Sequence, residues 1–196
     1  MNTAQPIREK EDLEKMKEYY LSISPNERNY LLVILGLNTA LRISDLLKLT
    51  WNEIYDLERE RCLEHIQLTE QKTGKKTCIY VNQSICDALG RYYRKLKEQK
   101  RQINAETYLF THSNQNQAIS RVQAYRIIRK AADYWGISGT ICCHSLRKTF
   151  GYHAWQQGVS PALLVNIYNH SSYEVTKRYL GIEQDDRDHI FKTIHL

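Results

Sequence analysis

Residues 143–150 read CHSLRKTF, and this stretch decides the fold and the chemistry expected of the chain. It opens a helix expected over residues 144–157, which ends at Gly158 because glycine readily takes the left-handed conformation of a helix end. His144 and Arg147 are three positions apart, so they share one face of that helix.

Two shorter helices follow on the carboxyl side. The first is expected over residues 160–168, which begin with Ser-Pro and so place proline at the first helical position. The second carries Tyr179 and begins at a capping box, SSYE, at residues 171–174. His170 lies just before this helix, so His170 and Tyr179 are expected to meet the His-Arg pair of the preceding helix in one pocket.

The amino-terminal side predicts more helices and one hairpin. A charged helix is expected over residues 8–22, and the capping box SPNE at 24–27 begins an apolar helix over 25–38. Alternating and β-branched residues at 64–69 and 77–81 flank QKTGKK, whose glycine suits a hairpin turn. Two further helices are expected at 84–100 and 121–135. The expected fold class is α+β, mainly α, with a small antiparallel sheet.

The composition indicates one basic domain without a membrane segment. Lysine and arginine number 28 against 22 acidic residues, and the net charge of +6 is compatible with a polyanionic partner. The five cysteines lack the paired spacing of a zinc site and are expected to be reduced packing residues. There is no apolar run long enough to span a bilayer and no signal peptide, so a cytoplasmic location is expected.

Arg42 lies within TALRISDLL at residues 39–47, where a charge among apolar residues needs a strong reason. Cutting a phosphodiester without a metal requires cations for the negative transition state, a nucleophile, and an acid for the departing sugar oxygen. Guanidinium groups match phosphate oxygens and stay charged, so Arg42 and Arg147 are suited to hold a scissile phosphate.

Tyr179 is the candidate nucleophile, and it needs help because a phenol with a pKa of about 10 reacts weakly at neutral pH. His144 is the expected helper. The acid for the leaving oxygen is expected at the lysine-rich hairpin tip, where Lys72 lies on the strand side of the turn. Lys75 and Lys76 are the competing assignments.

Five segments resemble, in this order, the conserved boxes of tyrosine recombinases of the phage integrase type: ALRISDLLKLTW, QKTGKK, HSLRKTF, NHSS and TKRYLGI. The resemblance covers residues 39–182 and implies the catalytic-domain fold of that family. The catalytic residues that it implies are the phosphate-binding Arg42 and Arg147, the proton donor Lys72, the supporting His144 and His170, and the nucleophile Tyr179. It also matches Asp45 to an acidic residue that supports the first arginine.

Two features depart from the family pattern. The second histidine box is usually Leu-Gly-His, whereas this chain has Tyr168-Asn169-His170, so the bend must use asparagine, which tolerates positive φ best after glycine. The family normally carries an N-terminal DNA-binding domain, whereas only residues 1–23 precede the catalytic domain expected here. An excised fragment or a short-form protein is therefore expected. The expected division is a linker or first-helix start at 1–23, the catalytic domain at 24–182, and a tail at 183–196.

The expected function is site-specific DNA recombination through a 3′-phosphotyrosine on Tyr179 and a free 5′-hydroxyl, without metal, nucleotide or other cofactor. Double-stranded DNA is the expected partner, with a tetramer on two duplexes formed by a chain that is monomeric alone. The tail is expected to dock on a neighbouring protomer through Ile190, Phe191 and Ile194. A type IB topoisomerase and a non-catalytic DNA-binding regulator are the alternatives. Integration, excision and dimer resolution stay open, because all use this chemistry.

Overall fold

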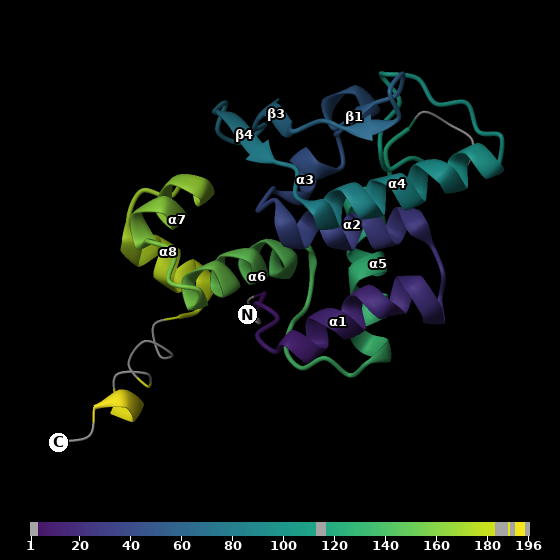
Figure 1. Ribbon diagram of the computed structural model, residues 1–196. Helices are drawn as coiled ribbons and strands as arrows, with labels where there is room; N and C mark the ends of the chain where they lie inside the picture. Colours follow the sequence, from purple (N-terminus) through teal and green to yellow (C-terminus); the bar gives the residue numbers. More distant parts are fainter. Residues whose placement is uncertain (1–3, 113–116, 183–187, 189–190, 195–196) are drawn as a thin grey trace.

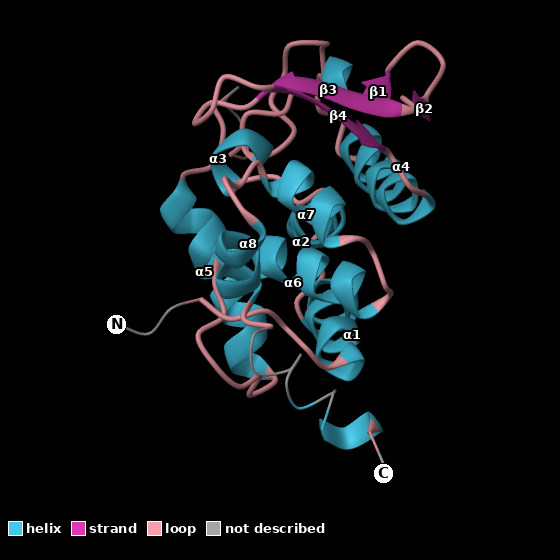
Figure 2. Ribbon diagram, turned by 90° about the vertical axis from the view of Figure 1, so that its left-hand side faces the viewer, coloured by secondary structure: helices cyan, strands magenta, loops and turns pink. Residues whose placement is uncertain are grey.

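The computed structural model describes residues 4–112, 117–182, 188 and 191–194, and helices dominate it (Figures 1 and 2). The helical elements are α1 (Lys10–Glu18), the π-helical turn η1 (Tyr19–Ile23), α2 (Glu27–Asn38), α3 (Ile43–Leu46), the 3-10 turn η2 (Trp51–Glu53), α4 (Gln83–Glu98), α5 (Arg121–Tyr134), α6 (Cys143–Gln156), α7 (Pro161–Tyr168) and α8 (Tyr173–Leu180). Two antiparallel strand pairs are β1 (Tyr55–Asp56) with β2 (Arg61–Cys62), and β3 (His65–Thr69) with β4 (Lys76–Tyr80). The predicted mainly helical α+β class is confirmed.

The β3–β4 hairpin is the one predicted around the lysine-rich turn. Its last register pair joins Thr69 to Lys76. The loop beyond is closed by two backbone hydrogen bonds, from the Glu70 N–H to the Lys75 carbonyl at 2.9 Å and from the Gly74 N–H to the Glu70 carbonyl at 2.8 Å. The β1–β2 pair was not predicted, because strands of two residues are too short to show a periodic pattern.

The start of α2 differs from the predicted capping box. The side chain of Asn26 accepts a hydrogen bond from the Asn29 N–H at 3.0 Å, so Asn26 is the cap and the helix begins at Glu27. Ser24 still belongs to the preceding turn, since its N–H donates to the Tyr19 carbonyl at 2.8 Å. The prediction that the helix begins at residue 25 is therefore wrong by two positions.

Three clusters of buried side chains hold these elements together. The largest contains Trp51 and joins α2, α4 and β3. The second contains Ile7 and Met16 and joins the amino-terminal segment and α1 to α5 and α6. The third joins α6, α7 and α8 through Tyr168 and Leu180, which are fully buried. The third cluster therefore packs together the helices that carry His144 and Tyr179.

Helix α6 bridges the two sides of the molecule. Figure 1 shows it running from α2 toward α7 and α8, which lie on the side away from α4 and α5. The contacts of α6 with α2 and with α7 are both close. A Cβ atom at Gly36 of α2 would lie 2.5 Å from Leu146 Cδ1, and one at Gly151 would lie 2.5 Å from the Tyr168 hydroxyl oxygen. No helix among the described residues is long and apolar enough to cross a membrane.

Candidate active site

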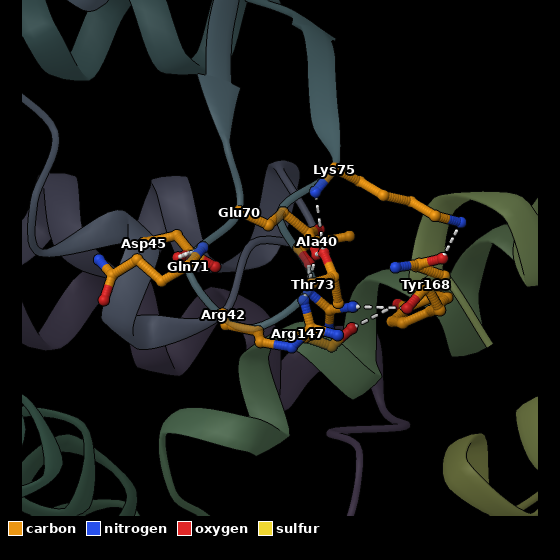
Figure 3. Close-up of polar contacts among 10 residues, drawn as sticks. Ala40, Arg42, Asp45, Glu70, Gln71, Thr73, Lys75, Arg147 and Tyr168 are labelled. Carbon is orange, nitrogen blue, oxygen red and sulfur yellow. Dashed lines mark hydrogen bonds and ion pairs between the residues drawn. The ribbon is translucent and has the colours of Figure 1, made fainter.

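Arg147 lies on α6 at the centre of the candidate site. It is only 3% exposed, and a buried charge needs partners. Nη1 donates to the Ala40 carbonyl, and Nη2 donates to the Tyr168 carbonyl at 3.2 Å (Figure 3). The guanidinium also lies over the Tyr168 ring, 4.8 Å from its centroid. Burial lowers the pKa of Arg147, but arginine remains charged in proteins, so these contacts orient a permanent cation.

Arg42 precedes α3 and links it to the hairpin. Its Nη1 forms an ion pair with Glu70 Oε2, and the two side chains are 15% and 5% exposed. The hydroxyl of Thr73 donates to the same carboxylate oxygen at 2.8 Å (Figure 3). The first arginine is therefore held by the residue that opens the hairpin loop.

Glu70, and not Asp45, is the acidic residue that supports Arg42, so the role carried over for Asp45 is wrong. Asp45 Oδ1 accepts from the Gln71 N–H at 3.0 Å, and Oδ2 has no hydrogen-bond partner among the described residues. Asp45 thus holds the backbone next to Lys72. Sequence reasoning missed Glu70 because a lone acidic residue at a strand end carries no spacing signal. Its position directly before QKTGKK was the one available indication.

The turn between α7 and α8 positions His170. Asn169 ends α7 with φ 53° and ψ 48°, so the predicted left-handed bend at this asparagine is confirmed. His170 Nδ1 lies 3.0 Å from the hydroxyl oxygen of Thr176, which is fully buried and donates to the Ser172 carbonyl at 3.2 Å. This chain of contacts fixes the imidazole ring. Burial, followed by the charges of nearby arginines, lowers the pKa of His170.

Tyr179 is half-buried on α8 and lies beside His170. The two rings meet edge to face with centroids 5.0 Å apart, and Lys148 Nζ lies 5.0 Å from the Tyr179 ring centroid. Burial raises the pKa of the Tyr179 phenol, while the positive charge of Arg147 acts in the opposite direction. The phenol is therefore protonated at neutral pH and needs a base when it attacks.

His144 is exposed at the start of α6. Its pKa is lowered from the ordinary value of 6.5, first by partial desolvation and then by the positive charges of Arg147, Lys148, Arg42 and Lys72. The imidazole is therefore neutral at neutral pH and able to accept a proton.

The three hairpin lysines have different surroundings. Lys72 is exposed on the loop, and its charge acts on His144. The Lys75 side chain extends away from the hairpin toward the end of α7, where its Nζ donates to Asn169 Oδ1 (Figure 3). Lys76 lies in β4. Lys72 therefore stays the predicted acid, because it is the loop lysine whose charge acts on the candidate base.

The structure brings the two predicted arginines, both histidines and Tyr179 into one positively charged site. Sequence reasoning missed Lys148, since a lysine directly after Arg147 shows no spacing of its own. Among the described residues, no group of three or more histidine, cysteine, aspartate or glutamate side chains is placed to hold a metal ion. Cations around a phenol can bind a phosphate group. The phenol can then attack the phosphorus while the neutral imidazole nearby accepts its proton.

The chain resembles known proteins over most of its length. The model of the phage integrase family matches residues 8–185. The Probable integrase/recombinase YoeC of Bacillus subtilis (strain 168) is 41% identical over 185 residues, which are 94% of this chain and 93% of that protein.

Two solved structures have a similar fold. The XerA recombinase superposes with a TM-score of 0.73 at 21% identity, covering 99% of this chain and 66% of the other. The XerH site-specific recombinase bound to palindromic difH substrate, a post-cleavage complex, gives 0.72 at 19% identity, covering 91% and 50%. The chain thus spans only part of the length of these two proteins.

Proposed function

The chain belongs to the phage integrase family, and on this premise we propose that it recombines DNA site-specifically, with Tyr179 as the nucleophile. The observation that carries the proposal is the Tyr179 phenol packed against His170, with the positive charge of Arg147 acting on it. The structure of XerH with its difH substrate supports double-stranded DNA as the partner of the present chain.

Each residue of the site has its own role in the proposed cleavage reaction. Arg42 and Arg147 hold the non-bridging oxygens of the scissile phosphate and stabilise the added negative charge of the transition state. The Tyr179 oxygen bonds to phosphorus while its proton passes to His144, and the bond from phosphorus to the 5′-oxygen breaks. Lys72 donates a proton to that oxygen. The phosphotyrosine conserves the bond energy, so a 5′-hydroxyl from a partner strand reverses the reaction.

The assembly follows from the chemistry. Exchange between two duplexes needs four cuts, so four protomers act together, each with a catalytic domain at residues 24–182 and a tail at 183–196.

Two expected tail anchors, Phe191 and Ile194, are 81% and 57% exposed, and Ile190 lies outside the described residues. Deleting residues 184–196 is expected to weaken assembly on DNA in size-exclusion chromatography. Unchanged assembly would exclude the docking role of the tail.

The covalent intermediate is the direct test. The protein is incubated with nicked duplexes that tile the DNA flanking its gene, and products are separated under denaturing conditions. The wild type is expected to yield a protein–DNA adduct that Tyr179→Phe abolishes, while Tyr173→Phe, on the same helix, retains it. An undiminished adduct in Tyr179→Phe would refute the assignment. Relaxation of supercoiled plasmid without joint products would favour a topoisomerase instead.

A further inference from the structure

A hydrogen bond joins the hairpin tip to the turn between α7 and α8. Lys75 Nζ donates to Asn169 Oδ1, although the two residues are 94 positions apart. Figure 3 shows the Lys75 side chain extended away from the hairpin toward the helix end that carries Tyr168. The contact therefore connects two parts of the site that come from opposite sides of the molecule.

Asn169 meets two requirements at once. Its left-handed backbone, φ 53°, turns the chain from α7 toward His170. Glycine, which the family pattern usually has here, takes this conformation more easily than asparagine but has no side chain. The asparagine therefore adds an acceptor, Oδ1, at a position where the bend alone would favour glycine.

Lys75 belongs to the loop that arranges the other catalytic groups. Its carbonyl accepts from the Glu70 N–H at 2.9 Å, and the Glu70 carboxylate pairs with Arg42. Lys72 lies in the same loop and is exposed. A restraint on the Lys75 side chain therefore limits the motion of the segment that carries the predicted acid.

We propose that the Lys75–Asn169 hydrogen bond is a latch that holds the hairpin tip, and with it Lys72, over the active site before DNA binds. This inference rests on the proposed function, because it concerns protonation of the leaving 5′-oxygen. Lys75 and Asn169 are positioning residues and touch no reacting atom. Proton transfer needs the acid within hydrogen-bond distance of the leaving group, so a loop that samples other positions slows the step.

The first test measures the loop itself, without DNA. Asn169→Gly keeps the left-handed bend and removes Oδ1, and Lys75→Met removes the ammonium group at similar length. Both are expected to speed amide hydrogen exchange of Glu70 and Gly74 several-fold, with no further increase in the double variant. Lys75→Arg should preserve slow exchange, as should Lys95→Met, a charge-matched control on α4. Unchanged exchange in Asn169→Gly would overturn the latch.

The second test separates leaving-group protonation from the other steps. Cleavage in a single turnover is compared on a normal nicked duplex and on one with sulfur in place of the bridging 5′-oxygen. A thiolate leaves without a proton because its conjugate acid is far stronger than an alcohol. Asn169→Gly and Lys75→Met are expected to slow only the normal substrate, by roughly fivefold, the equivalent of about 1 kcal/mol.

The outcomes are distinguishable. Equal losses on both substrates would overturn the link between the latch and Lys72. If the wild type forms no adduct with either substrate, the proposed function fails, and hydrogen exchange still decides whether the latch exists.

Discussion

Arg147 and Tyr168 are joined by two reciprocal hydrogen bonds from side chain to backbone. Arg147 Nη2 donates to the Tyr168 carbonyl at 3.2 Å, and the Tyr168 hydroxyl donates to the Arg147 carbonyl at 2.6 Å. Both residues are buried, and the guanidinium lies over the tyrosine ring. The direction of the Arg147 guanidinium is therefore set by the packing of α6 against α7.

Tyr168→Phe removes the hydroxyl and leaves the rest of this arrangement. The free energy of unfolding is expected to fall by about 1 kcal/mol, the usual net value of a buried hydrogen bond, as measured by urea denaturation. Tyr80→Phe is the control, because the Tyr80 side chain lies on the surface, 63% exposed. Equal stability of the two variants would contradict the role assigned to the Tyr168 hydroxyl.

Gly151→Ala tests the close contact between α6 and the last two helices. The new Cβ would lie 2.5 Å from the Tyr168 hydroxyl oxygen and 2.6 Å from Leu180 Cδ2, so these buried side chains must shift or the helices must move apart. We expect a loss of about 1–3 kcal/mol in the free energy of unfolding, together with slower adduct formation. Gly90→Ala on α4 is the matched control. Its Cβ would meet nothing within 4 Å, so alanine should stabilise the helix by about 0.5–1 kcal/mol.

Glu70→Gln tests the ion pair with Arg42. The amide keeps the shape but loses the charge, so the largely buried Arg42 loses its charged partner. The free energy of unfolding is expected to fall by about 2 kcal/mol, and cleavage should slow because Arg42 is less well oriented. Glu98→Gln, at an exposed pair with Lys95, should change stability by less than about 0.5 kcal/mol. Similar effects of the two substitutions would show that the Arg42–Glu70 pair contributes no more to stability than an exposed ion pair does.

The pH dependence of stability tests the surroundings of His144. Its folded-state pKa lies below the ordinary 6.5, so the folded protein binds the proton less readily than the unfolded chain. The resulting contribution to stability is present above the unfolded pKa and is lost as the pH falls through the folded value. His144→Gln should therefore lose less stability than the wild type between about pH 7 and about pH 5 in urea titrations. An identical loss would mean that His144 has an ordinary pKa.

Local patterns were sufficient to predict most elements of the fold. The hairpin, α4, α5, α6 and α7 appear close to the predicted bounds, because side-chain periodicity, caps and stop residues act within a few positions. The left-handed bend at Asn169 follows from the same kind of reasoning, since few residues tolerate positive φ.

The order and spacing of the boxes were also sufficient to select the residues of the candidate site. They indicated the two arginines, both histidines and Tyr179, which the structure brings together. What the sequence by itself determined is therefore which segments form most of the helices and strands, and which side chains are the candidates for the chemistry.

Only the tertiary structure decided the partners of these side chains. Arg42 pairs with Glu70, 28 positions away, rather than with Asp45 on the adjacent helical turn, and Lys75 reaches Asn169 across 94 positions. Such choices depend on how the three buried clusters place α6, α7 and the hairpin against one another. Contacts between distant segments are selected by packing of the whole domain, and no short pattern encodes that.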